Sequence, residues 1–310
     1  MFDKIDEGRV LEGPHKAFRL VSPPGLPPFL HAIHHPRAIF PEELWGQETA
    51  AGVLRKNLGG LLQGLPPLST LIHGHRGTGK TSLVLSLWNE WNRDPARPSL
   101  RLIQADVTGI SFIAPLVDIL SLRSEPYLLL LDDLTFSPND SNFRQFKAFL
   151  DGGAMAPPDN LGLVVTTNIR NLLPESRAAR GDALHEEEQT DDTHAIRDRF
   201  GIVLSFDEPS VEIYLLIVLR KARLASLLPP DAEEAALLAR LADWQEKTKE
   251  TAATSPDPAV RFLLAALGYS RARGSRSGRT ARQFVDLALR GLLSDIPGMN
   301  SLNRSSENDK

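Results

Sequence analysis

The sequence predicts an α/β protein whose parallel sheet is followed by a smaller domain made only of helices. Between residues 43 and 208, short apolar runs alternate with stretches of helical periodicity. Strands that are buried on both faces of a parallel sheet read as such continuous apolar runs. After Phe206 the strand-like runs stop and only helical patterns follow. We therefore expect a five-stranded, doubly wound parallel sheet over residues 43–208 and a helical domain over residues 209–295.

Residues 1–42 are rich in proline and histidine and show no sustained period, so we expect an extended arm with at most short elements. His31, His34 and His35 raise the alternative of a metal site. A polar loop beside Pro36 is favoured, because no further cluster of ligands is in sight.

The elements of the predicted core follow in order along the chain. From Leu44 the pattern is helical, with leucines recurring at spacings of three and four until Gly64 and the prolines after it end the helix. The expected strands are residues 71–73, 100–105, 127–131, 161–166 and 202–206. The helices between these strands are expected to begin near Lys80, Ser111 and Ser141.

Three or four helices are expected after the sheet, because proline pairs and capping residues divide the remaining chain into helical stretches. These stretches are residues 209–227, 231–249, 257–270 and 279–294. The last segment, residues 296–310, is polar and is expected to be disordered.

Composition restricts the classes of protein that the chain can belong to. The 310 residues are 42% hydrophobic and 24% charged, with a net charge of −4, which gives no overall attraction to nucleic acid or anionic membranes. The absence of cysteine excludes disulfides and thiolate chemistry. The acidic start is unlike a signal peptide, and no run approaches the roughly 18 apolar residues of a membrane span. We expect a cytoplasmic protein without a membrane span.

A phosphate-binding motif lies between the first expected strand and the helix after it. Residues 74–81 read GHRGTGKT and match the Walker A pattern G-x-x-x-x-G-K-[ST]. Its glycines let backbone N–H groups surround phosphate oxygens, and the helix N-terminus adds a positive dipole end. Lys80 would contact the β- and γ-phosphates of ATP, and the Thr81 hydroxyl would bind Mg²⁺. The expected nucleotide-binding residues are Gly74, His75, Arg76, Gly77, Thr78, Gly79, Lys80, Thr81 and Ser82.

Polar residues also follow two later strands. Asp132 and Asp133 end the run YLLLL about 50 residues after the motif, where a Walker B strand belongs. Asp132 would hold Mg²⁺ and Asp133 would polarise the attacking water; as an alternative, both acids cap the following turn or helix. Asn168 ends the run 163–167 and is a candidate for orienting that water, although an asparagine at this place is also a common turn former.

Taken together, these residues resemble the AAA+ superfamily of P-loop ATPases. The sequence is most similar to a group of predicted bacterial ATPases known as domain of unknown function 815, over about residues 40–290. The segments that carry this resemblance are residues 73–84, 128–136, 150–160, 166–175, 196–206 and 273–285.

The resemblance implies an assembly in which ATP lies between neighbouring subunits, so we expect a homo-oligomer in the form of a ring or partial ring. Arg199 matches the arginine finger that would reach into the site of the next subunit. Its alternative role is a surface ion pair with Asp198. Asp133 is shorter than the glutamate of many relatives, which makes its role as the base less firm than the metal role of Asp132.

The resemblance also assigns residues around the rest of the nucleotide. Arg279 matches the sensor-2 arginine that contacts the γ-phosphate from within the same chain, with Arg276 as the competing choice. The residues expected to pack on the adenine are Leu44, Trp45 and Gly46, followed by Gln47.

Two segments depart from the pattern of AAA+ proteins that thread polypeptides. Residues 107–113 lack the aromatic–hydrophobic–glycine signature of a pore loop, and Phe112 is a better match to a core position. An acidic insertion at residues 182–194 precedes Arg199 and has no assigned role. Substrate unfolding through a central pore is therefore not expected.

These patterns predict an ATPase that binds Mg²⁺ and ATP at a subunit interface and uses hydrolysis to change the conformation of an unidentified protein partner. One alternative is a nucleotide-gated switch or scaffold with little turnover. Another is an ATP-dependent loader that acts on DNA, for which the arginine-rich stretch 271–282 is the only hint. The sequence does not identify the biological process.

Overall fold

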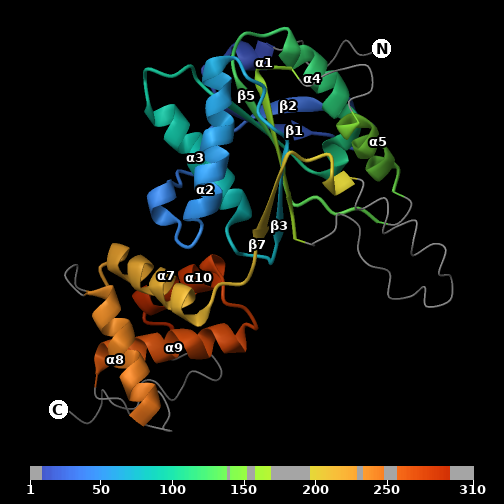
Figure 1. Cartoon of the computed structure of the whole chain (residues 1–310). Helices are drawn as coiled ribbons and strands as arrows, with labels where there is room; N and C mark the ends of the chain where they lie inside the picture. Colours follow the sequence, from blue (N-terminus) through green and yellow to red (C-terminus); the bar gives the residue numbers. More distant parts are fainter. Residues whose placement is uncertain are drawn as a thin grey trace, which may run out of the picture. The chain divides into compact units, whose positions relative to one another are not determined.

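The computed structural model describes residues 9–137, 140–151, 158–168, 196–228, 233–247 and 257–293. The chain forms two compact units (Figure 1). The first unit contains residues 1–75 and 80–206, and the second contains residues 76–79 together with those from 207 onward. In the described part of the chain, no helix is long and apolar enough to cross a membrane.

A seven-stranded sheet in the order β2-β1-β4-β5-β6-β3-β7 forms the centre of the first unit. Neighbouring strands are parallel except for the antiparallel pair β1 and β2. The strands are β1 (Ala17–Val21), β2 (Phe29–Ala32), β3 (Thr70–Gly74), β4 (Arg101–Ala105), β5 (Tyr127–Leu131), β6 (Leu161–Thr167) and β7 (Ile202–Phe206). The α/β class and the parallel core are confirmed.

The five parallel strands expected over residues 43–208 are present as β3–β7, and the segment interpreted as an extended arm with at most short elements adds two further strands to the sheet. In β1 the side chains of Phe18 and Leu20 are buried, whereas Arg19 is exposed, as expected for a strand with one face on the core. The strand is only five residues long and a proline-rich turn follows it, so its periodicity was too short to identify. β1 pairs in parallel with β4 and extends the sheet at that side.

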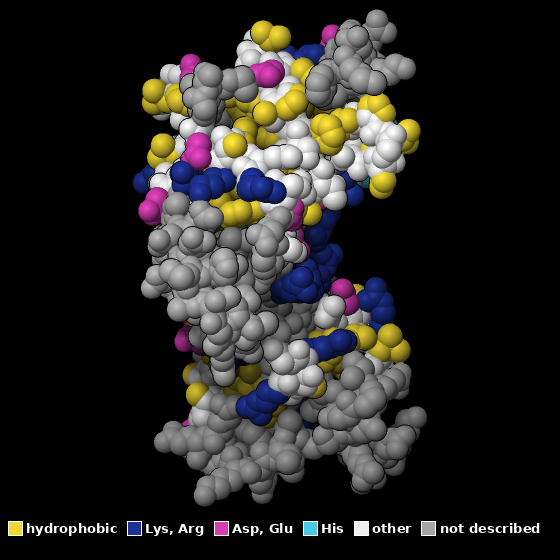
Figure 2. Space-filling model, turned by 90° about the vertical axis from the view of Figure 1, so that its right-hand side faces the viewer, with side chains coloured by type: hydrophobic (Ala, Val, Ile, Leu, Met, Phe, Trp, Pro, Cys, Tyr) yellow, Lys and Arg dark blue, Asp and Glu magenta, His cyan; other side chains and the backbone are white. Residues whose placement is uncertain are grey.

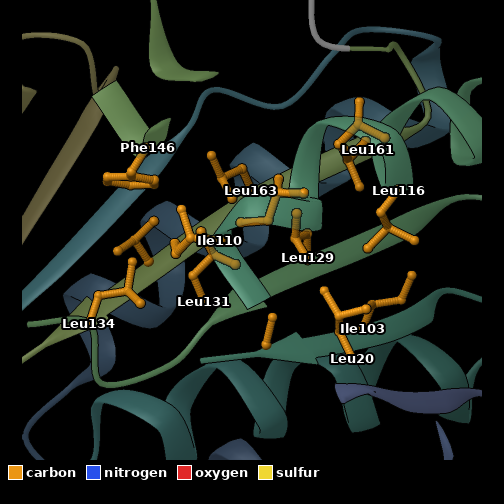
Figure 3. Packing of buried hydrophobic residues seen from close by; sticks show 14 of the residues in the cluster. Leu20, Ile103, Ile110, Leu116, Leu129, Leu131, Leu134, Phe146, Leu161 and Leu163 are labelled. Atoms are coloured by element: carbon orange, nitrogen blue, oxygen red, sulfur yellow. The ribbon is translucent and has the colours of Figure 1, made fainter. Parts of the chain in front are cut away.

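Helices cover both faces of this sheet (Figure 1). The α2 and α3 helices cover one face, where Leu128 and Leu130 of β5 share a core cluster with them. The α4 and α5 helices pack on the other face, where Leu129 and Leu131 of the same strand join the core (Figure 3). The helical elements are α1 (Arg9–Glu12), η1 (Pro41–Glu43), α2 (Glu48–Gly59), η2 (Gly60–Gln63), α3 (Lys80–Arg93), η3 (Val107–Phe112), α4 (Ile113–Ser121) and α5 (Ser141–Leu150).

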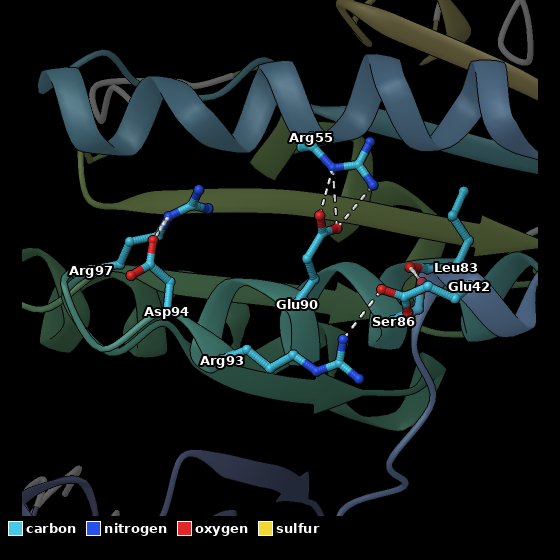
Figure 4. Close-up of polar contacts among 8 residues, drawn as sticks. All are labelled: Glu42, Arg55, Leu83, Ser86, Glu90, Arg93, Asp94 and Arg97. Carbon is cyan, nitrogen blue, oxygen red and sulfur yellow. Dashed lines mark hydrogen bonds and ion pairs between the residues drawn. The ribbon is translucent and has the colours of Figure 1, made fainter.

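The outer side of α3 is held to its neighbours by ion pairs (Figure 4). Glu90 accepts hydrogen bonds from Arg55 of α2, with 2.9 Å between Arg55 Nε and Glu90 Oε1. Arg93 pairs with Glu42 of η1 at 3.2 Å. Such exposed pairs contribute less than about 1 kcal/mol each, so burial of the opposite side of α3 dominates its stability.

The described helices of the second unit pack around an aromatic core. The unit contains α7 (Val211–Leu224), α8 (Glu234–Lys247), α9 (Pro258–Ala272) and α10 (Gly278–Leu289). Tyr214 of α7 donates a hydrogen bond to the Ala266 carbonyl of α9 at 3.1 Å. The rings of Tyr269 and Phe284 pack with 5.9 Å between their centroids, joining α9 to α10. The prediction of an all-helical region after the sheet is confirmed for these residues.

Candidate nucleotide-binding site

The predicted phosphate loop begins where β3 meets its neighbour β7. Gly74, the last residue of β3, has a φ of 135°, a conformation that residues with a side chain rarely adopt. A Cβ atom at this position would lie 2.0 Å from the Phe206 carbonyl oxygen, and that same oxygen accepts a hydrogen bond from His75 N at 3.0 Å. Glycine is therefore required for the chain to leave the sheet here and enter the loop.

Lys80 begins α3 and extends back toward the loop. Its side chain is buried, and Nζ donates to the carbonyls of Gly74 at 2.8 Å and His75 at 2.7 Å. Nζ also donates to Asn168 Oδ1 at 2.9 Å. An ammonium has three N–H donors, and these three acceptors match them. The positive charge that the sequence predicted for the phosphate site is thus held at the mouth of the loop.

Thr81 and Asp132 come together although 51 residues separate them. The carboxyl ends of β3 and β5 lie at the same edge of the sheet, where ligands bind in open α/β folds. Thr81 Oγ1 donates to Asp132 Oδ1 at 2.6 Å. A hydroxyl and a carboxylate are hard oxygen ligands of the kind that Mg²⁺ prefers, usually with phosphate oxygens and waters completing the shell. No cluster of three or more His, Asp or Glu side chains that could hold a metal ion occurs among the described residues.

Asp133 adopts a left-handed backbone conformation with a φ of 56°. Aspartate is among the few non-glycine residues that tolerate this region. Its carboxylate accepts a hydrogen bond from Asn168 Nδ2, so Asn168 contacts both Lys80 and Asp133. Asp140 caps α5, so the acids do not cap that helix, and the alternative that they cap the turn after the strand stays open.

Two residues at the site were missed by sequence analysis. Thr166 of β6 donates its hydroxyl hydrogen to Asp132 Oδ1 at 2.7 Å and accepts one from Asp133 N at 2.9 Å. Gln104 of β4 donates to Asp132 Oδ2 at 2.9 Å. The signal for either residue in the sequence is a polar side chain near the end of a strand whose central residues are mostly apolar.

Arg199 does not pair with Asp198, its neighbour in the sequence and the alternative partner considered above. Its guanidinium forms an ion pair with Asp151, the residue that ends α5. The predicted role of Arg199 in a neighbouring subunit stays a prediction, and the acidic insertion 182–194 lies outside the described residues.

The residues predicted to contact the adenine lie between η1 and α2 of the first unit. Leu44 packs against the core beside α2 and α3. Gly46 has a φ of 78°, and its N–H donates to Glu48 Oε1 at 3.0 Å. The side chain of Trp45 is half-buried. Their contact with adenine stays a prediction.

The second unit contains both candidates for the sensor-2 arginine together with the tip of the phosphate loop. Ser277 caps α10, and a Cβ at Gly77 would lie 2.8 Å from Ser277 Oγ. Arg279 N donates to the Gly77 carbonyl at 3.4 Å. The Arg276 guanidinium is paired with Glu208 at 3.4 Å. The choice between the two arginines stays open.

Several solved structures are distantly similar to the chain, and no curated protein matches it. The FIGL-1 AAA domain in complex with ADP is 18% identical with a TM-score of 0.47, covering 85% of this chain and 76% of that one. The RuvB Holliday junction branch migration motor of Thermotoga maritima is 18% identical with a TM-score of 0.42, covering 84% and 73%. The Aeropyrum pernix ORC1 protein in complex with DNA is 16% identical with a TM-score of 0.44, covering 81% and 66%. Structural similarities this distant do not support a conclusion about function.

The match to a protein family is more informative because it extends over most of the chain. The model of the family described as "Protein of unknown function (DUF815)" matches residues 15–291, a range that contains the phosphate loop, both acids and α7–α10. The chain therefore belongs to the DUF815 family.

Proposed function

We propose that the protein hydrolyses ATP in the presence of Mg²⁺ and that the site lies where subunits meet in a homo-oligomer. The observation that carries this proposal is the convergence of three contacts at one edge of the sheet. Thr81 contacts Asp132, and Asn168 contacts both Lys80 and Asp133. The first contact brings two oxygen ligands together, and the other two link the phosphate-binding cation to the candidate base.

Each of these residues has a distinct task in the proposed reaction. Lys80 and the amides of the loop bind the phosphates, and Thr81 with Asp132 holds Mg²⁺. A metal in this position neutralises charge on the phosphate oxygens when it is bound. Asp133 accepts a proton from the attacking water, and Asn168 orients that water with its amide. We assign the adenine contact to Trp45 with its neighbours.

The subunit interface enters the proposal through Arg199. An arginine from a neighbouring subunit can accelerate phosphoryl transfer by about 10³–10⁵-fold. In the single chain the Arg199 guanidinium is held by Asp151, and both side chains are partly exposed. We propose that Arg199 exchanges this carboxylate for the phosphates of the adjacent subunit on assembly. Arg279 contributes a further positive charge from the same chain in this proposal.

Phosphate release by the purified full chain tests hydrolysis. We expect turnover that requires Mg²⁺, and we expect Lys80→Ala to abolish nucleotide binding measured with a fluorescent ATP analogue. Lys56→Ala on the exposed side of α2 is a matched control that should bind and hydrolyse normally. Tight binding with no turnover in any assembly state would replace the ATPase by a nucleotide-gated switch.

Mixing two inactive variants tests the interface. Arg199→Ala subunits keep the phosphate loop, and Lys80→Ala subunits keep the arginine, so mixed assemblies regain some complete sites. We expect activity to reappear on mixing, whereas Arg144→Ala, an exposed arginine on α5, should be active without mixing. A mixture that stays inactive, although the subunits assemble, argues against completion of the site by Arg199.

We further propose that hydrolysis drives a conformational change in a protein partner. A role on DNA has weaker support, because the net charge is −4. On the face drawn in Figure 2, the described Lys and Arg side chains form several separate groups. DNA that stimulates turnover, with an effect that fades as salt rises, would favour the loader instead.

A further inference from the structure

The hydroxyl of Thr166 lies between the two acids at the end of β5. This hydroxyl donates a hydrogen bond to Asp132 Oδ1 at 2.7 Å, and its oxygen accepts one from Asp133 N at 2.9 Å. Thr166 is a buried residue, so exchanging these partners for water would require a local opening. One side chain thus contacts both the candidate metal ligand and the backbone of the candidate base.

Thr166 also holds the backbone turn that directs Asp133. The carbonyl of Thr166 accepts from Leu134 N at 2.8 Å, while its hydroxyl accepts from Asp133 N. Asp133 is one of two non-glycine residues in the described part of the chain with a positive φ, a conformation that needs support from its surroundings. Thr166 therefore binds two consecutive backbone N–H groups, those of Asp133 and Leu134, and so stabilises the turn. This turn directs the Asp133 carboxylate toward Asn168.

The Asp132 carboxylate is held from both neighbouring strands. Thr166 reaches Oδ1 from β6, and Gln104 reaches Oδ2 from β4 at 2.9 Å. Thr81 donates its proton to Oδ1 as well, which leaves the lone pairs of the Thr81 oxygen available to a metal. The carboxylate therefore cannot rotate toward or away from a metal without breaking hydrogen bonds on both oxygens.

We infer that Thr166, assisted by Gln104, is a positioning residue that sets where the Mg²⁺ ligand Asp132 and the base Asp133 point. This inference rests on the proposed function and adds two residues to its site. Partners that orient metal ligands commonly change metal affinity by about 10–100-fold when they are removed. A threonine that only satisfied its own buried hydroxyl would affect stability and leave the metal requirement unchanged.

Thr166→Val removes the hydroxyl and keeps the shape of the side chain. The measurement is the binding of a fluorescent ATP analogue as Mg²⁺ is titrated. The Mg²⁺ concentration at which its effect on binding is half-maximal should rise at least tenfold in Thr166→Val. Affinity for the same analogue in EDTA should stay within about twofold of the wild type. Thr166→Ser keeps the hydroxyl and should restore the wild-type Mg²⁺ requirement.

Thr70→Val is the matched control, because Thr70 is a buried, hydrogen-bonded threonine at the far end of the adjacent strand β3. It should lower stability without changing the Mg²⁺ requirement. An unchanged requirement in Thr166→Val, or an equal shift in Thr70→Val, would overturn the inference. If Thr166→Val does not fold, Gln104→Leu is measured in its place. It should raise the required Mg²⁺ concentration by a smaller factor, and an unchanged Mg²⁺ requirement would contradict the inference.

The binding measurement separates this inference from the proposed hydrolysis. Wild-type protein whose binding is strengthened by Mg²⁺ but which releases no phosphate would remove the ATPase proposal only, and the Thr166 comparison would still be decisive. Wild-type protein that hydrolyses ATP but whose nucleotide binding is not strengthened by Mg²⁺ would overturn the Thr166 inference and leave the proposed hydrolysis standing.

Discussion

Replacing Asn168 by alanine should tighten ADP binding while it slows ATP hydrolysis. In the single chain, Lys80 Nζ donates to two backbone carbonyls and to Asn168 Oδ1 at 2.9 Å. Lys80 must release one of these acceptors before it can donate to a phosphate. The Asn168 side chain can rotate away, whereas the carbonyls are fixed by the loop, so Asn168 competes with the nucleotide for Lys80.

The size of the effect follows from the strength of that contact. A hydrogen bond to a charged group contributes about 1.5–3 kcal/mol net when it is buried. The partial exposure of Asn168 reduces this to about 1 kcal/mol, and ADP has no γ-phosphate for the amide to contact in return. Asn168→Ala should therefore bind ADP about fivefold more tightly, since 1.4 kcal/mol is tenfold. Turnover should fall about 100-fold because the attacking water loses its orienting amide.

Calorimetric titration with ADP and steady-state phosphate release measure the two effects. Asn89→Ala is the control, because Asn89 makes two hydrogen bonds from α3 to the carbonyls of Arg37 and Ile39, away from the loop. It should leave both quantities unchanged. Weaker ADP binding by Asn168→Ala would refute the competition, and unchanged turnover would refute the role in orienting water.

Three further substitutions test other parts of the account. Gly74→Ala would place a Cβ 2.0 Å from a carbonyl oxygen and should destabilise the fold by about 3 kcal/mol in denaturant titration; Gly52→Ala, with open space in α2, should not destabilise it. Asp133→Asn should stay within about 0.5 kcal/mol of the wild type, whereas Asp133→Ala should lose about 1 kcal/mol, because alanine tolerates the left-handed region poorly. Asp151→Ala removes the carboxylate that pairs with Arg199; it should cost less than about 1 kcal/mol and let turnover begin at lower protein concentration, and a need for higher concentration would contradict the proposed exchange.

The sequence was sufficient to predict the parallel core and to name several polar residues that contact one another at the carboxyl edge of the sheet. Strands buried on both faces are continuous apolar runs, so β5 was visible as YLLLL, with its two acids at the end. The phosphate loop was visible because its chemistry requires glycines and a lysine at fixed spacing. Topology then brings Thr81 and Asp132 together, since parallel strands present their carboxyl ends at one edge.

The remaining features depend on tertiary contacts that no local pattern contains. Thr166 acts through hydrogen bonds to residues more than 30 positions away, and a threonine in a strand is otherwise unremarkable in sequence. Arg199 has an acid beside it in the sequence, yet its partner is Asp151, 48 positions away. The β1–β2 hairpin was not predicted from the sequence, because its strands are short and a proline-rich turn separates them.

The most direct test of the central claim is the identity of the nucleotide that the protein retains after incubation with ATP and Mg²⁺. The wild-type chain should hold mainly ADP, because the site hydrolyses what it binds. Asp133→Asn keeps the shape and the backbone preference of the residue but removes the base, so it should hold mainly ATP with similar occupancy. Equal amounts of ADP in both proteins, or intact ATP in the wild type, would contradict the account.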